Sequence, residues 1–198
     1  MLYVLIVGLL LIPVWILLRP KVVHHERLFF KGKAIIVSNH WSMADPVLIA
    51  FVSPRIIHFM AKAELFRSWI GNLFFRSIYA FPVEREKTDL TSLRKAKEVL
   101  DAGKVFGIFP EGKRSVTGDL DELEKGAAFM ALRCDAPIIP VYTDPKTFKR
   151  FRIRMIVGEP IDAKAEAKKG TGKAVDVVTE VIRNRLMEMK NEMERMDS

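Results

Sequence analysis

The chain has 198 residues, enough for one globular domain with a short accessory segment. Its hydrophobic fraction of 49% supports a buried core and excludes a wholly disordered chain. Its 32 basic and 24 acidic residues give a net charge of +8, which suits a partner that carries phosphates, either nucleic acid or an anionic membrane surface. The single cysteine, Cys134, excludes an intrachain disulfide and a four-cysteine zinc site, and it indicates a reducing compartment.

The first predicted element is an apolar N-terminal segment, residues 1–18, with 16 apolar residues and no charge. As a helix it would be about 27 Å long, just short of the roughly 30 Å hydrocarbon core of a bilayer. A signal peptide would have a basic residue before its apolar run, and this segment has none. Several basic residues follow it in the sequence instead. We therefore expect residues 1–32 to form a membrane anchor and basic junction, spanning the bilayer or embedded in one leaflet, with the remaining chain on the cytoplasmic side of the cell membrane. The alternative is a buried core helix.

Residues 33–198 alternate short β-branched runs with helical patterns. Strands are expected at 34–38, 56–60, 78–83, 104–109, 137–142 and 152–157. Helices are expected near 46–53, 62–75, 88–102 and 122–134. This alternation predicts an α/β fold, with a mixed, largely parallel sheet flanked by helices. Residues 162–173 are expected to be a polar linker, and 175–196 an amphipathic closing helix packed on the domain.

The helix expected at 62–75 carries a broad apolar stripe with basic residues nearby. Such a helix fits an interfacial position, with aromatic side chains at the acyl boundary and basic groups near lipid phosphates. It fits packing against a core equally well, and the stripe alone does not decide between them. The apolar members are Leu65, Phe66, Trp69, Ile70, Leu73 and Phe74, and the basic ones Lys62, Arg67 and Arg76.

The densest polar cluster, SNHWSMADP at 38–46, follows the strand expected at 34–38. On a regular helix His40 and Asp45 would lie about 140° apart around the axis and could not meet. At a strand-to-helix turn with Ser42 as N-cap, Asp45 falls in the first turn and can accept the ring N–H of His40. That pair suits general-base catalysis. The alternative is a capping carboxylate beside a surface histidine.

A second polar cluster, GIFPEGKRS at 107–115, follows the strand expected at 104–109. It nearly matches the phosphate-binding loop of nucleotide triphosphatases, but Arg114 stands where that loop needs a magnesium-binding hydroxyl. A phosphomonoester still suits this segment, because Lys113, Arg114 and Ser115 offer two cations and a hydroxyl.

Other reactive residue types give weaker signals. Arg85 ends an apolar strand run and alone indicates only a surface cation. His24, His25 and His58 lack metal-ligand spacing with a carboxylate or cysteine, so we expect no metal site. Cys134 lies in an expected helix and is interpreted as a buried structural thiol.

Taken in order, these segments resemble the lysophosphatidic acid acyltransferases of the glycerolipid acyltransferase superfamily. The similarity covers about residues 33–160. Trp41 stands where a glutamine is common in the family, and Lys113 where threonine is common. The four matching motifs are N-H-x4-D at Asn39-His40 to Asp45-Pro46, an apolar strand ending in arginine at Phe81 to Arg85, F-P-E-G-[TK]-R-S at Phe109 to Ser115, and a proline-bearing strand at Ala136 to Val141.

The resemblance implies transfer of a fatty acyl group from acyl-CoA or acyl-acyl carrier protein to the sn-2 hydroxyl of 1-acylglycerol 3-phosphate. The product would be phosphatidic acid, for phospholipid biosynthesis, and no cofactor beyond the thioester co-substrate would be needed. In this reaction His40 oriented by Asp45 is the base, and amides near Gly112 suit the oxyanion. The phosphate-binding residues would be Arg85, Lys113, Arg114 and Ser115. The family further places Glu111 and Ser115 at the acceptor site, and we expect Pro140 to shape the acyl-donor side.

Two alternatives remain open. One is the same chemistry on another acceptor, such as glycerol 3-phosphate or another lysophospholipid. The other is a membrane-tethered basic binding module, whose best evidence is a basic and aromatic stripe that could grip nucleic acid. We favour an anionic membrane or an acidic acyl carrier protein as the partner of this stripe, and expect no nucleic acid. The stripe comprises Lys146, Phe148, Lys149, Arg150, Phe151, Arg152 and Arg154.

Overall fold

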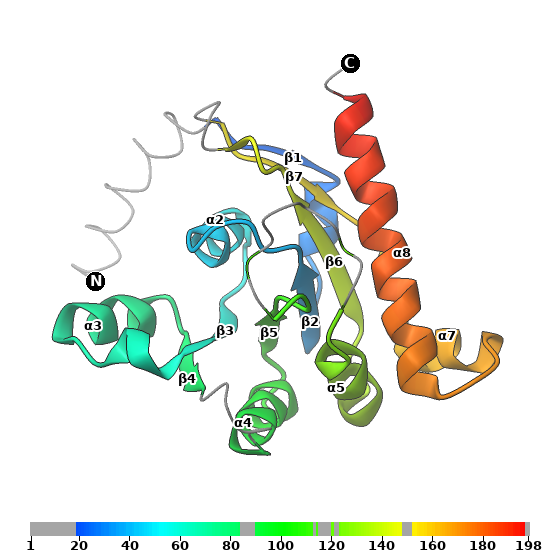
Figure 1. Ribbon diagram of the computed structural model, residues 1–198, viewed down its shortest axis with the longest axis horizontal. Helices are drawn as coiled ribbons and strands as arrows, with labels where there is room; N and C mark the ends of the chain where they lie inside the picture. Colours follow the sequence, from blue (N-terminus) through cyan, green and yellow to red (C-terminus); the bar gives the residue numbers. More distant parts are fainter. Residues whose placement is uncertain are drawn as a thin grey trace.

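The centre of the protein is a sheet in the strand order β1-β7-β6-β2-β5-β3-β4 (Figure 1). The computed structural model describes residues 19–83, 90–112, 114, 120, 123–147 and 152–196. Every pair of neighbouring strands is parallel except β6 and β7, which confirms the predicted mixed, largely parallel sheet. The strands are β1 Lys21–Val23, β2 Ala34–Ser38, β3 Ile57–Lys62, β4 Phe81–Val83, β5 Val105–Ile108, β6 Ile138–Thr143 and β7 Arg154–Val157.

Helices cover both faces of the sheet, which explains why residues 34–37 of the central strand β2 are all apolar. Because successive side chains of a strand point to opposite faces, Ile35 and Val37 join the core beneath one helical layer, whereas Ala34 and Ile36 join the core on the other face. The first layer contains α4 Leu90–Asp101, α5 Gly126–Cys134, α7 Ala163–Lys169 and α8 Ala174–Arg195, and the second contains η1 His25–Leu28 and α2 Asp45–Val52.

The C-terminal amphipathic helix is confirmed as α8. Its side chains Val178, Ile182, Leu186, Met189 and Met193 are buried against the domain. Figure 1 shows this long helix lying beside β6 and β7, with α7 at its start. The predicted stripe therefore packs on this chain's own sheet.

The prediction of a polar linker at 162–173 is wrong, because most of this segment forms helix α7. The carboxylate of Asp162 caps this helix by accepting the backbone N–H groups of Lys164 and Ala165, both at 3.0 Å. The segment that follows is rich in Ala, Lys and Glu, which are strong helix formers. Gly170 then ends the helix.

Two other segments differ from expectation. The strand expected at 78–83 is shortened to β4, because the preceding helix continues to Ser77 and Tyr79 has a left-handed φ of 57°. The helix expected at 62–75 is divided at Ser68 into η2 Ala63–Phe66 and α3 Trp69–Ser77.

The N-terminal basic junction contributes structure that the sequence pattern did not reveal. Lys21–Val23 forms the edge strand β1 beside β7, and η1 follows it. The apolar segment 1–18 lies outside the described residues. Across the residues that are described, the structure has no helix both long and apolar enough to span a bilayer.

Candidate active site

The two polar clusters meet at one edge of the sheet. Strands β2 and β5 are parallel neighbours, with Val37 opposite Ile108. Their carboxyl ends therefore open at the same edge, where ligands of open α/β sheets usually bind. The chain after β2 carries His40, and the chain after β5 carries Glu111.

His40 and Asp45 form the pair that their spacing predicts at a strand-to-helix turn. The ring Nδ1 lies 3.1 Å from Asp45 Oδ2, and the two side chains are 13% and 2% exposed. A carboxylate can only accept at this contact, so Nδ1 carries a proton, and in the neutral imidazole Nε2 then keeps its lone pair. The geometry thus leaves the second ring nitrogen able to take a proton from a substrate.

Asp45 is itself held by the backbone of the loop that carries His40. Its Oδ2 accepts the backbone N–H groups of Trp41 at 2.6 Å and of Ser42 at 2.7 Å. Bonds of this kind to a charged acceptor are among the stronger ones in proteins. The buried carboxylate therefore fixes both the imidazole and the loop.

The expected N-cap role of Ser42 is corrected by the structure. Helix α2 begins at Asp45 with Ala44 at the N-cap, and the Ser42 hydroxyl accepts the N–H of Ala44 at 3.2 Å instead. The carboxylate of Asp45 turns back to the loop, so it does not cap α2. Pro46 in the first turn lacks an N–H, which removes one donor that would otherwise need a partner.

The third motif packs directly on His40. The ring of Phe109 stacks on the imidazole of His40, with centroids 4.2 Å apart and planes inclined at 23°. Glu111 Oε1 accepts the backbone N–H of His40 at 2.8 Å. Sequence reasoning missed both contacts, although the order of two parallel strands could have suggested that these segments touch.

Glu111 is a half-buried carboxylate beside this pair. Its burial raises its pKa, the nearby charge of Asp45 adds to that rise, and the hydrogen bond from the His40 N–H opposes it. This carboxylate therefore holds the backbone of His40, and its pKa depends on the charges of His40 and Asp45.

Asn39 joins the site loop to β6. Its Oδ1 accepts the N–H of Thr143 at 2.8 Å, and its Nδ2 donates to the carbonyl of the same residue at 3.0 Å. The side chain thereby continues the pairing of β2 with β6 beyond Ser38, the last residue of β2. Asn39 is 2% exposed, so these bonds replace those that water would supply.

The remaining predicted site residues are placed as follows. Gly112 has a left-handed φ of 63°, and its N–H donates to the carbonyl of Phe109 at 3.2 Å, which closes a turn. Arg114 is exposed. Pro140 is buried within β6, opposite Val37. Arg85, Lys113 and Ser115 lie outside the described residues.

Cys134 is buried at the end of α5, as the sequence suggested. Burial, reinforced by the charge of Asp101, raises the pKa of its thiol. A protonated, buried thiol suits a structural role.

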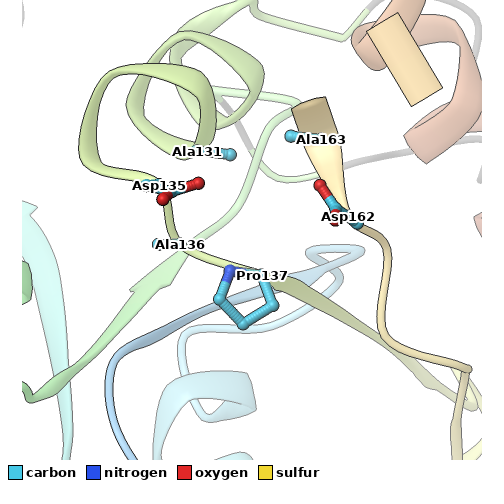
Figure 2. A pocket seen from close by; sticks show the side chains of 6 residues that line it. All are labelled: Ala131, Asp135, Ala136, Pro137, Asp162 and Ala163. Atoms are coloured by element: carbon cyan, nitrogen blue, oxygen red, sulfur yellow. The ribbon is translucent and has the colours of Figure 1, made fainter. Parts of the chain in front are cut away.

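A cavity of about 140 Å³ lies away from this site. Figure 2 shows the side chains around it, between the end of α5, the start of β6 and the start of α7. Because β6 is parallel to β2, its start lies at the edge of the sheet opposite to His40. The cavity is lined by Ala131, Asp135, Ala136, Pro137, Asp162 and Ala163.

Comparisons with known proteins show the family and the fold of this chain. Residues 19–144 match the family described as Acyltransferase. A 1-acyl-sn-glycerol-3-phosphate acyltransferase of Bacillus subtilis is 32% identical over 183 residues, which cover 89% of this chain and 90% of that protein. A protein of the same name from Streptococcus pneumoniae is 32% identical over 80% of this chain and 61% of its own length. The crystal structure of the 1-acyl-sn-glycerophosphate acyltransferase PlsC from Thermotoga maritima superimposes with a TM-score of 0.66 at 25% identity, covering 91% of this chain and 79% of that one.

Proposed function

Because the chain belongs to the acyltransferase family, we propose that it transfers a fatty acyl group from a thioester to the sn-2 hydroxyl of 1-acylglycerol 3-phosphate, giving phosphatidic acid. The observation that carries this proposal is the pairing of the partly buried His40 with the buried Asp45 at 3.1 Å, at the carboxyl edge of the sheet. The names of the relatives from Bacillus subtilis and Streptococcus pneumoniae support the acceptor.

The base is the imidazole of His40. Nε2 takes the proton of the acceptor hydroxyl while its oxygen attacks the thioester carbonyl carbon, forming the new C–O bond. Asp45 stabilises the resulting imidazolium and keeps the ring in place. The C–S bond then breaks, and the imidazolium returns the proton to the leaving sulfur. Neither metal nor prosthetic group has a step in this sequence.

The oxyanion formed on the carbonyl needs a hydrogen-bond donor. We assign this role to the backbone N–H of Gly112, which donates to the carbonyl of Phe109 at 3.2 Å in the structure. During the reaction this N–H would donate to the oxyanion instead. The left-handed φ of Gly112 favours glycine at this turn.

The acceptor phosphate would be bound by cations of the second and third motifs. Arg114 is exposed just beyond the Gly112 turn and suits a dianionic phosphate. Arg85, Lys113 and Ser115 are proposed to share this role. Glu111 would complete the acceptor site, where it already holds the backbone of His40.

The acyl donor is acyl-CoA or an acyl-acyl carrier protein, and Pro140 is proposed to shape the donor side. Binding assays with each thioester would separate the two donors.

The proposed acceptor is a lysolipid that partitions into the bilayer, and this supports a membrane location for the chain. We propose that residues 1–18 anchor the chain in the cell membrane and that the catalytic domain lies on the cytoplasmic side. The alternative of a nucleic-acid module is disfavoured by one member of its basic stripe. Arg154 is 6% exposed and forms an ion pair with Asp144 at 3.1 Å, so it is not available to a phosphate backbone.

Turnover of the purified full chain with 1-acylglycerol 3-phosphate and each thioester tests the proposed function. Glycerol 3-phosphate and other lysophospholipids serve as competing acceptors. If one of these is turned over faster, that compound is the acceptor, and the proposed acyl-transfer chemistry still holds.

A further inference from the structure

Helix α3 presents large apolar side chains that the described part of the chain does not cover. None of the nine residues of the helix is buried. Trp69, Ile70 and Leu73 are 76%, 63% and 65% exposed, and Phe74 is 46% exposed. A helix of this length is marginal alone in water, and a cluster of exposed apolar side chains indicates a binding surface. We name these four residues the α3 face.

The exposure of the α3 face follows from how the helix is attached. The Ser68 hydroxyl caps α3 by accepting the N–H of Gly71 at 3.0 Å. A Cβ at Gly71 would lie 2.2 Å from the carbonyl oxygen of Leu65, so only glycine allows α3 to approach η2 this closely. Phe66 and Phe75 pack against the core and against one another, with ring centroids 5.4 Å apart. One side of the helix is therefore anchored, and the other side is left exposed.

The charge around the α3 face is positive. Arg67 and Arg76 are exposed at its two ends, and the sequence contains no acidic residue between Glu64 and Glu84. Aromatic and aliphatic side chains with basic residues at the rim are typical of helices that lie in the interface of an anionic bilayer.

The α3 face also lies at the edge of the sheet that carries the site. In a usual crossover the connecting helix runs back along the sheet to the start of the next strand. Here β3 ends at Lys62, and the chain returns with Phe81 opposite Met60. The whole segment 63–80 therefore leaves and rejoins the sheet near its carboxyl edge. Figure 1 shows α3 at the margin of the molecule, next to β4 and beside the sheet.

We propose that the α3 face inserts into the headgroup and acyl boundary of an anionic phospholipid bilayer. This contact is separate from the segment 1–18, and it would turn the His40 edge of the sheet toward the membrane. Its purpose rests on the proposed function, because a lipid acceptor must pass from the bilayer to that edge. The contact itself can be measured without turnover.

The test places a nitroxide label on the full chain in vesicles. Cys134→Ala removes the only cysteine, and Leu73→Cys then provides a unique site on the α3 face. The matched control is Phe129→Cys on α5, an exposed apolar residue on the opposite face of the sheet. Collision with oxygen, which enters lipid, is compared with collision with a water-soluble nickel chelate, in phosphatidylcholine vesicles with and without phosphatidylglycerol.

We expect the label at position 73 to favour oxygen in vesicles that contain phosphatidylglycerol, while the label at 129 favours the nickel chelate. Arg67→Gln with Arg76→Gln should weaken the insertion about fivefold for each arginine, whereas Arg133→Gln on α5 should leave it unchanged. A label at 73 that stays open to nickel in every vesicle would overturn the proposal. So would a label shielded from both reagents before vesicles are added, since a second copy or residues 1–18 would then cover the α3 face.

An activity control separates this inference from the proposed function. Leu73→Ser should retain the wild-type rate on a short-chain 1-acylglycerol 3-phosphate dissolved as monomers, because no bilayer is involved. If the wild-type chain transfers no acyl group to any acceptor, the proposed function fails while the labelling result still stands. If Leu73→Ser is inactive on monomers although it is folded, α3 serves the site and not the membrane, and the proposal is overturned.

Discussion

The imidazole of His40 lies flat against the ring of Phe109, with centroids 4.2 Å apart. The contact joins the loop after β2 to the loop after β5. Together with the carboxylate of Asp45, it restrains the ring on one face and at one nitrogen. The imidazole of His40 is therefore oriented by residues of two motifs that are about 70 positions apart in the sequence.

Replacing Phe109 with leucine should lower kcat, because the ring of His40 loses its stacking partner. Aromatic pairs contribute about 0.5 to 1.5 kcal/mol beyond simple burial, so a loss of roughly 2- to 10-fold is expected. Phe109→Tyr, which keeps the aromatic face, is the matched control. Steady-state kinetics that show equal losses for both variants would indicate that ring stacking does not orient the base.

Asp45→Asn should lower kcat strongly while the variant stays folded. The asparagine side chain can still accept one backbone N–H from Trp41 or Ser42, but it does not stabilise the imidazolium by charge. The expected loss in kcat lies at about 10²-fold or more, in the range usual for acid–base groups. Denaturant unfolding checks the fold of the variant. Wild-type turnover in a folded Asp45→Asn variant would contradict a catalytic role for Asp45 and leave it only the role of holding the loop.

Glu111→Gln tests the effect of burying a carboxylate. The folded-state pKa of Glu111 is raised by burial, so the folded protein holds its proton more tightly than the unfolded chain does. The wild-type carboxylate therefore lowers stability as pH rises from the ordinary carboxyl pKa through the raised one. Glutamine keeps the acceptor for the N–H of His40 without this charge.

The expected result is that Glu111→Gln gains free energy of unfolding relative to the wild type at neutral pH, and that the difference disappears in acid. Urea unfolding at several pH values measures it. A difference that grows as the pH falls would contradict the sign of the shift.

Arg114→Lys should impair use of a phosphate-bearing acceptor, although the charge is retained. A guanidinium can meet phosphate with two parallel bonds, whereas an ammonium cannot. A charged hydrogen bond contributes about 1.5 to 3 kcal/mol, so kcat/KM should fall by roughly 10- to 150-fold. The loss should be much smaller with a monoacylglycerol. Equal losses on both acceptors would make Arg114 a structural residue.

The sequence predicted the parts of this site that depend on local spacing. His40 and Asp45 are five positions apart, and a strand-to-helix turn is enough to bring them together. The contacts of Asn39 with Thr143 and of Phe109 with His40 depend on which strands are neighbours. Strand order is set by packing across the whole sheet, and spacing along the chain does not reveal it.

The departures in the fold have local causes. The sequence pattern places Asp162 in a polar linker. In the structure its carboxylate caps α7, a short helix made of strong helix formers. The stripe at 62–75 mixes two roles, since Phe66 and Phe75 pack on the core while Trp69 and Leu73 are exposed. The periodic pattern predicts one continuous helix over 62–75, whereas the chain is divided at Ser68 into η2 and α3.

The most direct test of the account is the rate of acyl transfer by His40→Ala on 1-acylglycerol 3-phosphate. Loss of the general base should lower kcat by about 10²- to 10⁴-fold, while circular dichroism and vesicle binding stay close to those of the wild type. Near-normal turnover by this folded variant would contradict the assignment of His40 as the base.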